Sequence, residues 1–529
     1  MNKPEDRLND FKKGVDAEDG RRRREETQLN LRKQKKNDRL TKRRLANTQS
    51  TQVKDGENNA GELPGVAGLV SSIVNTNAPF DQLIKGVRGI RRLLSSDRNP
   101  PFKEVIDSGA IKPLVECLMR TDSAELQFEA AWALTNLASS KYTSSLAEYP
   151  NAMDNLVQLL RSENPDVREQ CAWCLGNIAG DGTHYRDAII ELNAIEALQL
   201  NIQQPANESL LANIIWAVSN LCRAKPKPDL TKIRIILPDL FSVLRSWNSL
   251  NAETVQDALW ALSYVSDGDD KHINAVLETG GSELLQILVG ILRTGVSGDN
   301  KLLAPSLRIL GNFASGTEIQ TQAVIDAGVL DVAIAILDMP NKNLRKEMCW
   351  LLSNIAAGTP LQIDSFVRTK HLAERIVELA TDSEWQTKKE AIWTVSNVCT
   401  GGSDSHVSAL IENNTIEAMS SVLDLTGESR MIIVALDALK SIFEANERQG
   451  LNYLHIFDEC GGIEKLEDLQ SHTDNVVYEK AIGMIDEFFG EEDDEDENLA
   501  PKFDENGFTF GMDSPPPPKK FFFFFKQKK

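Results

Sequence analysis

Apolar residues recur at helical intervals along most of the chain. In segments such as 109–118, "GAIKPLVECL", and 151–160, "NAMDNLVQLL", they stand three and four residues apart, which places them on one face of a helix. Gly or Asn at the start of such segments predicts a turn before the helix. The alternation of apolar and polar residues that is typical of strands is hard to find. The pattern therefore predicts an all-α protein.

A second pattern, Trp followed four residues later by Asn, divides the chain into repeats. Five full copies begin at Trp132, Trp173, Trp216, Trp350 and Trp393, and two degenerate copies begin at Trp260 and Arg308. Successive starts are 41, 43, 44, 48, 42 and 43 residues apart. This period lies in the range of armadillo and HEAT repeats, whose short helices bury their apolar faces by stacking on the next unit. We expect a right-handed armadillo-repeat superhelical solenoid of about ten repeats over residues 64–489.

The two ends of the chain differ from the repeats. Residues 1–47 form a basic arm, and the polar residues 48–63 are typical of a flexible linker. Residues 490–529 form a tail that begins with the acidic run "EEDDEDEN" and ends with "SPPPPKKFFFFFKQKK", to which we assign no function. The arm and the tail are predicted to be disordered in isolation.

The charge distribution narrows the class of partner. The chain carries a net charge of −20, yet residues 1–50 hold 16 basic and 9 acidic residues, a net +7, which leaves −27 for the remainder. A body this acidic repels nucleic acid and anionic membranes, and it attracts a cationic partner. The seven Cys are scattered, which favours a reducing compartment, and no apolar run approaches the roughly 18 residues of a membrane span. We expect a cytosolic or nuclear protein without membrane insertion.

Trp and Asn four residues apart lie one above the other on a helix face. A single such Trp is ordinarily a core residue, but an apolar core has little use for a row of Asn in successive repeats. We therefore expect an exposed ladder along the concave surface. Its amides can clamp the backbone of an extended peptide, and its rings form slots for Lys or Arg, each worth about 0.5–2 kcal/mol. Carboxylates at Asp181, Glu347 and Glu390 would complete the slots.

The degenerate copies split this ladder in two. Tyr264 replaces Asn after Trp260, and Arg308 replaces Trp before Asn312. The centres of the two parts are roughly 40 Å apart, which about 12 extended residues would span. The expected ligand is therefore a basic peptide with one or two clusters. We name the parts the N-terminal patch (Trp132, Trp173 and Trp216 with their Asn residues) and the C-terminal patch (Trp350 and Trp393 with theirs).

The repeated Trp–Asn motif and the basic arm resemble those of the importin-α family, the nuclear-import adaptors also called karyopherin-α, from the N-terminus to about residue 490. The resemblance implies that the groove binds mono- and bipartite nuclear localisation signals and that the arm binds importin-β. It implies neither enzymatic activity nor a cofactor or metal. The implied major site comprises Trp132, Asn136, Gln170, Trp173, Asn177, Asp181, Trp216 and Asn220. The implied minor site comprises Arg308, Asn312, Glu347, Trp350, Asn354, Glu390, Trp393 and Asn397. The implied importin-β contacts are Arg21, Arg22, Arg23, Arg24, Arg32, Lys33, Lys35 and Lys36.

The arm also predicts regulation. Because arm and groove belong to one chain, Lys42, Arg43 and Arg44 can occupy the major site at a high effective concentration. Residues 25–40 have few large apolar side chains, so we expect them to fold only against an acidic partner. Cargo then competes poorly until importin-β removes the arm. The resemblance adds an exportin that recycles the protein, nuclear pore components as further partners, and shuttling between cytoplasm and nucleus.

One segment departs from the family pattern. Shortly after the Asn that corresponds to Asn136, the family usually has Ala-Ser-Gly-Thr. This chain has Ser140 in place of the Gly and Lys141 in place of the Thr. Loss of the glycine is expected to narrow the Lys pocket opposite Asp181, and Lys141 adds an opposing charge. The family's later hydroxyl is retained as Ser145.

Other chemical signals are weak. Cys171 and Cys174 have redox spacing, but they lie within a repeat helix and no second pair or nearby His supplies a zinc site. The run "GGSDSH" at 401–406 places Ser and His together in a loop, without an acid at useful spacing. No enzyme hypothesis follows from these residues.

Two other functions stay open. An armadillo scaffold or adhesion adaptor of the catenin kind would use the same fold, although such grooves are basic and grip acidic ligands. Direct nucleic-acid binding through residues 21–44 would require a basic folded surface, and the acidic body provides none that the sequence reveals.

Overall fold

The computed structural model describes residues 65–490, apart from residues 75–78, 96–99, 297, 299 and 426, together with residues 502–504 and 507–509. The proposed importin-β contacts between Arg21 and Lys36 lie outside the described residues, as do Lys42, Arg43 and Arg44. The division of the chain into arm, linker, repeats and tail stays a prediction.

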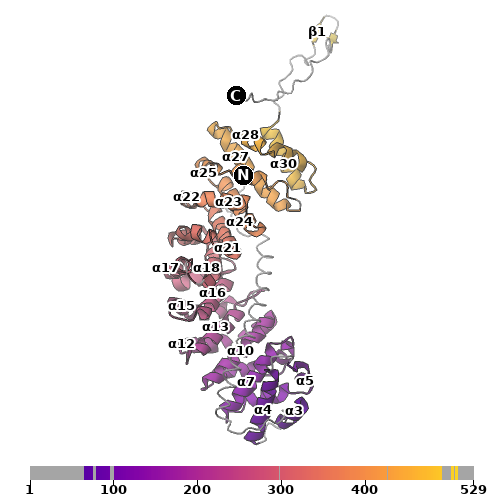
Figure 1. The fold of residues 1–529 in the computed structure, drawn as a ribbon, viewed down its shortest axis with the longest axis vertical. Coiled ribbons are helices and arrows are strands. Elements are labelled where there is room, and N and C mark those ends of the chain that lie inside the picture. The colour runs from indigo at the N-terminus through magenta and orange to yellow at the C-terminus, as the bar shows by residue number, and fades with distance from the viewer. Residues whose placement is uncertain are drawn as a thin grey trace.

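A row of long helices runs along one side of the molecule, and each packs against the next in chain order (Figure 1). They are α4 (Phe80–Leu94), α7 (Ala124–Ala138), α10 (Pro165–Asp181), α13 (Glu208–Leu221), α16 (Ala252–Ser266), α18 (Leu303–Ala314), α21 (Lys342–Ala356), α24 (Trp385–Gly401), α27 (Ser429–Gln449) and α30 (Asn475–Phe488). This succession confirms the predicted armadillo-type solenoid of about ten repeats.

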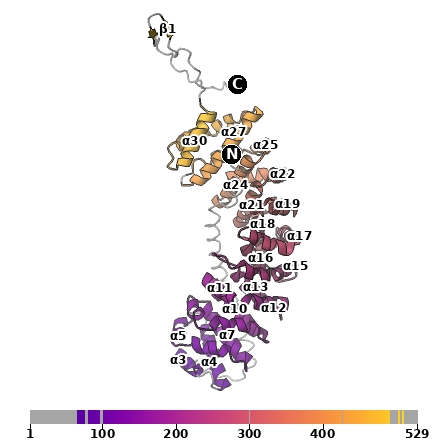
Figure 2. The same ribbon diagram turned by 180° about the vertical axis from the view of Figure 1, so that it is seen from behind.

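The remaining helices complete the repeats. They are α3 (Val66–Ile73), α5 (Phe102–Asp107), α6 (Ile111–Leu118), α8 (Thr143–Ala147), α9 (Ala152–Leu159), α11 (Thr183–Glu191), α12 (Ala194–Gln203), α14 (Leu230–Ile233), η1 (Arg234–Ile236), α15 (Leu237–Arg245), α17 (Asp270–Gly295), η2 (Asn300–Leu302), α19 (Glu318–Asp326), η3 (Leu330–Val332), α20 (Ala333–Leu337), α22 (Pro360–Arg368), α23 (Leu372–Thr381), α25 (Asp404–Ile411), α26 (Thr415–Ser420), α28 (Leu454–Glu459) and α29 (Gly462–Leu469). In the middle of the stack α12, α15, α17, α19, α22 and α25 lie on the side opposite the long row (Figure 2).

Many of the long helices begin where the sequence supplies a capping side chain. Ser123 caps α7 and Asn164 caps α10, each accepting hydrogen bonds from backbone N–H groups of the first turn. Asn207, Asn251 and Asn341 do the same for α13, α16 and α21. Such a cap contributes about 1 kcal/mol to helix stability, so the sequence fixes where these helices start.

In most repeats, the turn before the second helix contains one residue with a positive φ. Its φ lies between 51° and 86° at Gly109, Asn151, Asn193, Gly281, Gly328, His371, Asn414 and Gly461. Gly and Asn adopt this conformation at the lowest cost, which is why the sequence marks most of these turns. His371 holds the same position between α22 and α23, and the sequence pattern did not reveal it.

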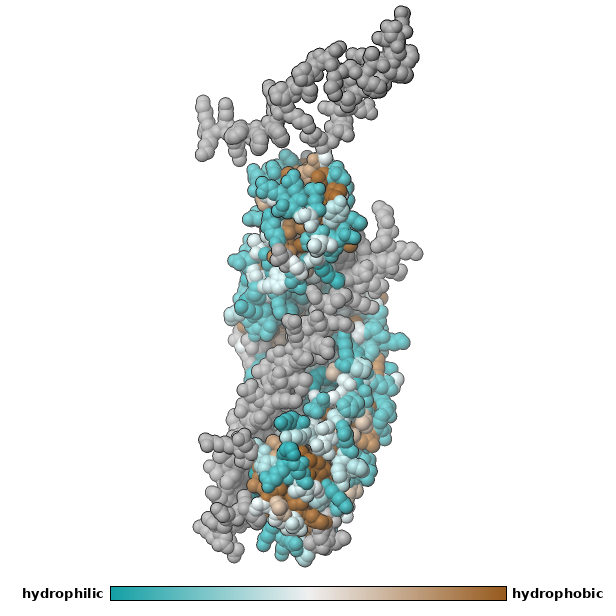
Figure 3. All heavy atoms as spheres, turned by 90° about the vertical axis from the view of Figure 1, so that its right-hand side faces the viewer, coloured by the Kyte–Doolittle hydropathy of each residue, from teal (hydrophilic) through white to brown (hydrophobic). Residues whose placement is uncertain are grey.

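The core is a continuous apolar layer between the long and short helices, from Val66 to Met484. By length and composition, α17 alone and the bent pair Glu318–Asp326 with Leu330–Leu337 could span a membrane. However, α17 comprises two helices of one repeat, because Gly281 breaks it with φ 51° and ψ −139°. On the face drawn in Figure 3, most of the described residues are hydrophilic, and hydrophobic residues gather near the N-terminal end. Val74 and Phe80, near that end of the chain, are exposed.

The tail contains a hairpin that the sequence pattern did not predict. Strands β1 (Lys502–Asp504) and β2 (Gly507–Thr509) pair antiparallel, with Phe503 opposite Phe508. It stands beyond the last helix of the solenoid (Figure 1).

Candidate functional site

The structure places both predicted patches on the row of long helices. The N-terminal patch lies on α7, α10 and α13, and the C-terminal patch lies on α21 and α24. In each of these helices Asn follows Trp by one turn, so both side chains occupy the same face. Since the helices stack in order, the Trp–Asn pairs form the predicted row.

Each ladder Asn ties its helix to the preceding repeat. The amide Nδ2 of Asn177 donates to the carbonyl of Thr135 at 3.2 Å, and that of Asn220 donates to Gly176 at 3.0 Å. The same bond recurs from Asn312 to Ser263, from Asn354 to Gly311 and from Asn397 to Ser353, at 3.0, 3.1 and 2.9 Å. In these five bonds the acceptor is the residue just before the Asn position of the preceding repeat. The amides therefore have a structural role that the sequence did not reveal.

A Gly just before the ladder Asn allows the Trp of the following repeat to pack against the helix backbone. A Cβ on Gly176 would lie 2.5 Å from the Trp216 ring, and one on Gly311 would lie 2.2 Å from the Trp350 ring. Both distances are far inside van der Waals contact, so these rings lie directly against the backbone of the preceding helix. Glycine is required there for close packing.

The Trp rings are less exposed than the sequence predicted. Trp132, Trp173 and Trp260 are only 3%, 4% and 7% exposed, yet none belongs to the continuous apolar core. Trp132 is covered by Phe128, edge-on with centroids 5.5 Å apart, and Trp260 stacks on Tyr264 at 5.8 Å. The prediction of an open ladder is thus wrong for these three buried rings, and at Trp132 and Trp260 a neighbouring aromatic side chain provides part of the cover. Trp216, Trp350 and Trp393 are half-buried.

Several ladder atoms are buried without a hydrogen-bond partner. Within the described residues these are Nε1 of Trp132 and Trp260, Oδ1 of Asn136 and Oε1 of Gln170. Buried polar atoms are ordinarily paired, so their clustering on one row indicates a ligand-binding surface. A donor and two acceptors on α7 and α10 suit the backbone of an extended peptide.

The carboxylates of the two patches are placed differently. Asp181 ends α10 and is exposed, whereas Glu347 is buried and receives two bonds from Arg308, at 2.8 and 2.6 Å. Burial lowers the pKa of Arg308, but the charge of Glu347 and its hydrogen bonds raise it by more, so the pKa is above its usual value. Glu390 is half-buried on α24. The one predicted carboxylate that is fully available to a ligand is therefore Asp181.

Sequence reasoning missed two buried acids of the N-terminal patch. Glu129 lies three residues before Trp132, the spacing that identified Glu347, and it pairs with Arg91 at 2.7 Å. Glu169 accepts hydrogen bonds from Ser209 and Asn213 at 2.9 and 2.8 Å. A full alignment of the repeats would have found Glu129.

The departure from the family pattern at Ser140 causes no backbone strain. Ser140 is not among the positive-φ residues, and its hydroxyl donates to the carbonyl of Leu137 at 2.7 Å. Lys141 is exposed, with its ammonium 5.2 Å from the Tyr142 ring. Ser145 is half-buried.

The Cys pair that the sequence analysis rejected as a redox site lies inside the folded repeats. Cys171 and Cys174 are buried, and burial raises the pKa of Cys171 well above its usual value, which disfavours a reactive thiolate. No group of potential metal ligands occurs in the described part of the chain.

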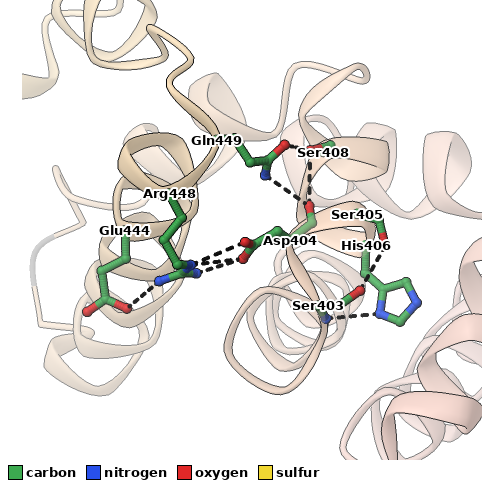
Figure 4. Close-up of polar contacts among 8 residues, drawn as sticks. All are labelled: Ser403, Asp404, Ser405, His406, Ser408, Glu444, Arg448 and Gln449. Atoms are coloured by element: carbon green, nitrogen blue, oxygen red, sulfur yellow. Dashed lines mark hydrogen bonds and ion pairs between the residues drawn. The ribbon is translucent and has the colours of Figure 1, made fainter.

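The Ser–His pair begins α25 (Figure 4). The backbone N–H of Ser403 donates to Nδ1 of His406 at 3.1 Å, while its hydroxyl contacts Ser405 at 2.9 Å. An acid is present after all, since Nε2 of His406 lies 3.3 Å from Asp364 on α22. The serine hydroxyl nevertheless hydrogen-bonds Ser405 and not the imidazole, and Ser403 with His406 forms a capping box, so the geometry is that of a helix start. Arg448 on α27 pairs with Asp404 and fastens this helix to the next repeat.

Known protein families match the chain along its length. The importin beta binding domain matches residues 7–89, armadillo/beta-catenin-like repeats match 98–139 and 317–357, a HEAT-like repeat matches 124–178, and an atypical Arm repeat matches 452–502. An engineered protein of known crystal structure is 25% identical, with a TM-score of 0.69, over 79% of this chain and 97% of its own.

Curated relatives match nearly the whole chain. Importin subunit alpha-1a of Oryza sativa subsp. japonica is 35% identical over 95% of this chain and 96% of its own length. Importin subunit alpha-5 of Arabidopsis thaliana is 37% identical over 94% of each. The repeat architecture, the Trp–Asn row and these similarities together show that the chain belongs to the importin-α family.

Proposed function

We propose that this protein is a nuclear import adaptor. Its groove binds classical mono- and bipartite nuclear localisation signals, and its N-terminal arm links the cargo to importin-β. The observation that carries the proposal is the Trp–Asn row with its unpaired buried polar atoms on α7 and α10. The match of residues 7–89 to an importin beta binding domain supports the second half.

The chemistry of the row fits an extended basic peptide. Asn136 and Gln170 each offer a buried, unpaired carbonyl oxygen to a ligand N–H, while Trp132 offers an indole N–H. Helices α7, α10 and α13 together carry six acidic residues and one basic residue, so the ligand cations enter a negative field. Asp181 at the end of α10 receives one Lys side chain.

A charge reversal tests the groove. Asp181→Lys is expected to weaken binding of a single-cluster basic peptide by about 100-fold, because a favourable ion pair becomes a repulsion. The matched control is Glu163→Lys, the same change at an exposed position just before α10. Fluorescence polarisation with a labelled peptide gives both affinities. Equal affinities for the two variants would refute the assignment, and tighter binding of an acidic peptide would favour the scaffold alternative.

The arm is proposed to compete with cargo for the same groove. Lys42, Arg43 and Arg44 would occupy the N-terminal patch until importin-β binds the basic residues that precede them. Replacing these three residues with Ala is expected to tighten basic-peptide binding by about tenfold, since a tethered competitor is lost. The same affinity with and without the substitutions would exclude autoinhibition. Exportin-dependent recycling, contacts with nuclear pore components and shuttling between cytoplasm and nucleus complete the proposed cycle.

A further inference from the structure

Two arginines stand where the ladder would otherwise have a Trp. Arg308 precedes Asn312 by four residues on α18. Just after α4, the hydroxyl of Ser95 accepts a hydrogen bond from the amide of Asn136 at 2.9 Å. Arg91 stands 41 residues before Trp132 and Ser95 stands 41 residues before Asn136, which matches the period of the repeats, so they hold the Trp and Asn positions of the first repeat.

Both arginines make the same two contacts with the following repeat. The guanidinium of Arg91 lies 4.4 Å from the centroid of the Trp132 ring, and that of Arg308 lies 5.6 Å from the Trp350 ring. Each also pairs with the Glu that precedes this Trp by three residues. Arg91 Nε donates to Glu129 at 2.7 Å and Arg308 Nε donates to Glu347 at 2.8 Å. Trp132 and Trp350 are the first Trp residues of the N-terminal and C-terminal patches.

This arrangement imitates a bound ligand. A cation over an indole ring, neutralised by a carboxylate at the slot end, is what the proposed function requires of a Lys or Arg in the peptide. The protein fills that place itself at the start of each patch. Around Trp132, the cations Arg88 and Arg91 face the acids Glu125 and Glu129, so the slot has no net charge to attract another cation.

A periodic ladder alone does not fix where a basic peptide lies. One repeat advances about 10 Å along the stack, which is about three residues of extended chain. A peptide with several basic residues could therefore shift by one repeat and make similar contacts. A slot already occupied at the start of each patch would prevent that shift.

We propose that Arg91 and Arg308 are specificity-determining residues that occupy the first cation slot of each patch and thereby fix the register of the bound peptide. This inference rests on the proposed function. The inference applies to peptides that are long enough to place a basic residue beyond a patch, on α4 or on α18.

The test compares three labelled peptides on the full-length chain by fluorescence polarisation. One carries a single basic cluster, and the other two carry an additional Arg three residues before or after it. The quantity measured is the ratio of extended-peptide to short-peptide affinity. On the wild-type chain we expect ratios near one for both extensions. For Arg91→Ala we expect one extension to bind about tenfold tighter than the short peptide, because the vacated slot retains Trp132 and the buried Glu129.

The matched control is Arg245→Ala. Arg245 on α15 also pairs with an acid, Glu283 at 2.8 Å, and lies 4.5 Å from an aromatic ring, Phe241, but it is outside the ladder. Its ratios should stay near one. Should Arg91→Ala fail to fold, Arg91→Gln keeps a hydrogen-bond donor for Glu129 while removing the charge, and the same gain is expected.

Ratios near one for a folded Arg91 variant would overturn the inference. Absence of short-peptide binding by the wild-type chain would instead refute the proposed function, so the two failures are distinguishable.

Discussion

The two patches share a motif but differ in charge. Helices α7, α10 and α13 carry six acidic residues and one basic residue, whereas α21 and α24 carry five basic and two acidic residues. In the C-terminal patch Glu347 is paired with Arg308, and the ammonium of Lys389 lies 5.5 Å from the Trp385 ring. The same Trp–Asn geometry is therefore placed in two different electrostatic fields. We expect the N-terminal patch to dominate binding of a single basic cluster and the C-terminal patch to contribute mainly to two-cluster ligands.

The largest expected effect comes from removing the motif in one patch at a time. Trp173→Ala with Asn177→Ala should weaken a single-cluster peptide by about 100-fold, since a ring and an amide are lost together. Trp393→Ala with Asn397→Ala should change the same affinity by less than about threefold.

The second variant is also the structural control for the first. Asn177 and Asn397 each hydrogen-bond the preceding repeat, so both variants lose the same inter-repeat contact. Fluorescence polarisation measures the affinities, and thermal unfolding checks the fold. Equal losses for the two variants would contradict the proposed ranking of the patches.

An intermediate effect is expected from giving the C-terminal patch the charge of the N-terminal one. Lys346→Glu with Lys389→Glu should tighten a two-cluster peptide by about fivefold at low salt, and the gain should shrink as salt is added. Lys370→Glu, an exposed change in the turn before α23, is the control for net charge. A gain of the same size from the control would mean that overall charge, rather than the patch, determines affinity.

The smallest expected effect is a loss of folding stability at alkaline pH, caused by Tyr185 on the helix that follows α10. Tyr185 on α11 donates to Glu148 at 2.8 Å, and burial together with this bond raises the pKa of the phenol to about 12. The folded chain then holds this proton more tightly than the unfolded chain, whose tyrosine has a pKa of about 10. This stabilisation is present below about pH 10 and is lost as the pH rises through about 12.

Tyr185→Phe removes the titrating group and keeps the ring. Denaturant unfolding at about pH 9 and about pH 11.5 should therefore show a larger loss of stability for the wild-type chain than for the variant. Identical losses would show that Tyr185 does not contribute to the alkaline sensitivity.

Much of the fold was predictable because its signals are local. The Asn and Ser caps of the long helices follow from neighbouring residues, as do the turns at Gly109 and Asn193. The turn at His371 was not predictable, because His has no strong preference that would distinguish it from a surface residue of the same helix pair. The hairpin at Lys502–Thr509 was missed because three-residue strands carry almost no periodicity.

For the candidate site, the motif was likewise predictable from the sequence and the contacts of its residues were not. The Trp–Asn spacing and its interruptions at Tyr264 and Arg308 were visible as a pattern, and the structure places the five full copies on one row of helices. The partners of these residues were not visible. Neither the pairing of Glu347 with Arg308 nor the burial of Trp132 beneath Phe128 could be inferred from spacing alone.

Local residue patterns specify the helices, their period and the two patches, because these depend on residues within a few turns of one another. The contacts of each ladder residue depend instead on the stacking of the repeats. The bonds from Asn177 to Thr135 and from Arg91 to Glu129 join residues 42 and 38 positions apart, about one full repeat. Whether such residues meet depends on how consecutive repeats stack, and that is set by packing of the whole core rather than by any local pattern.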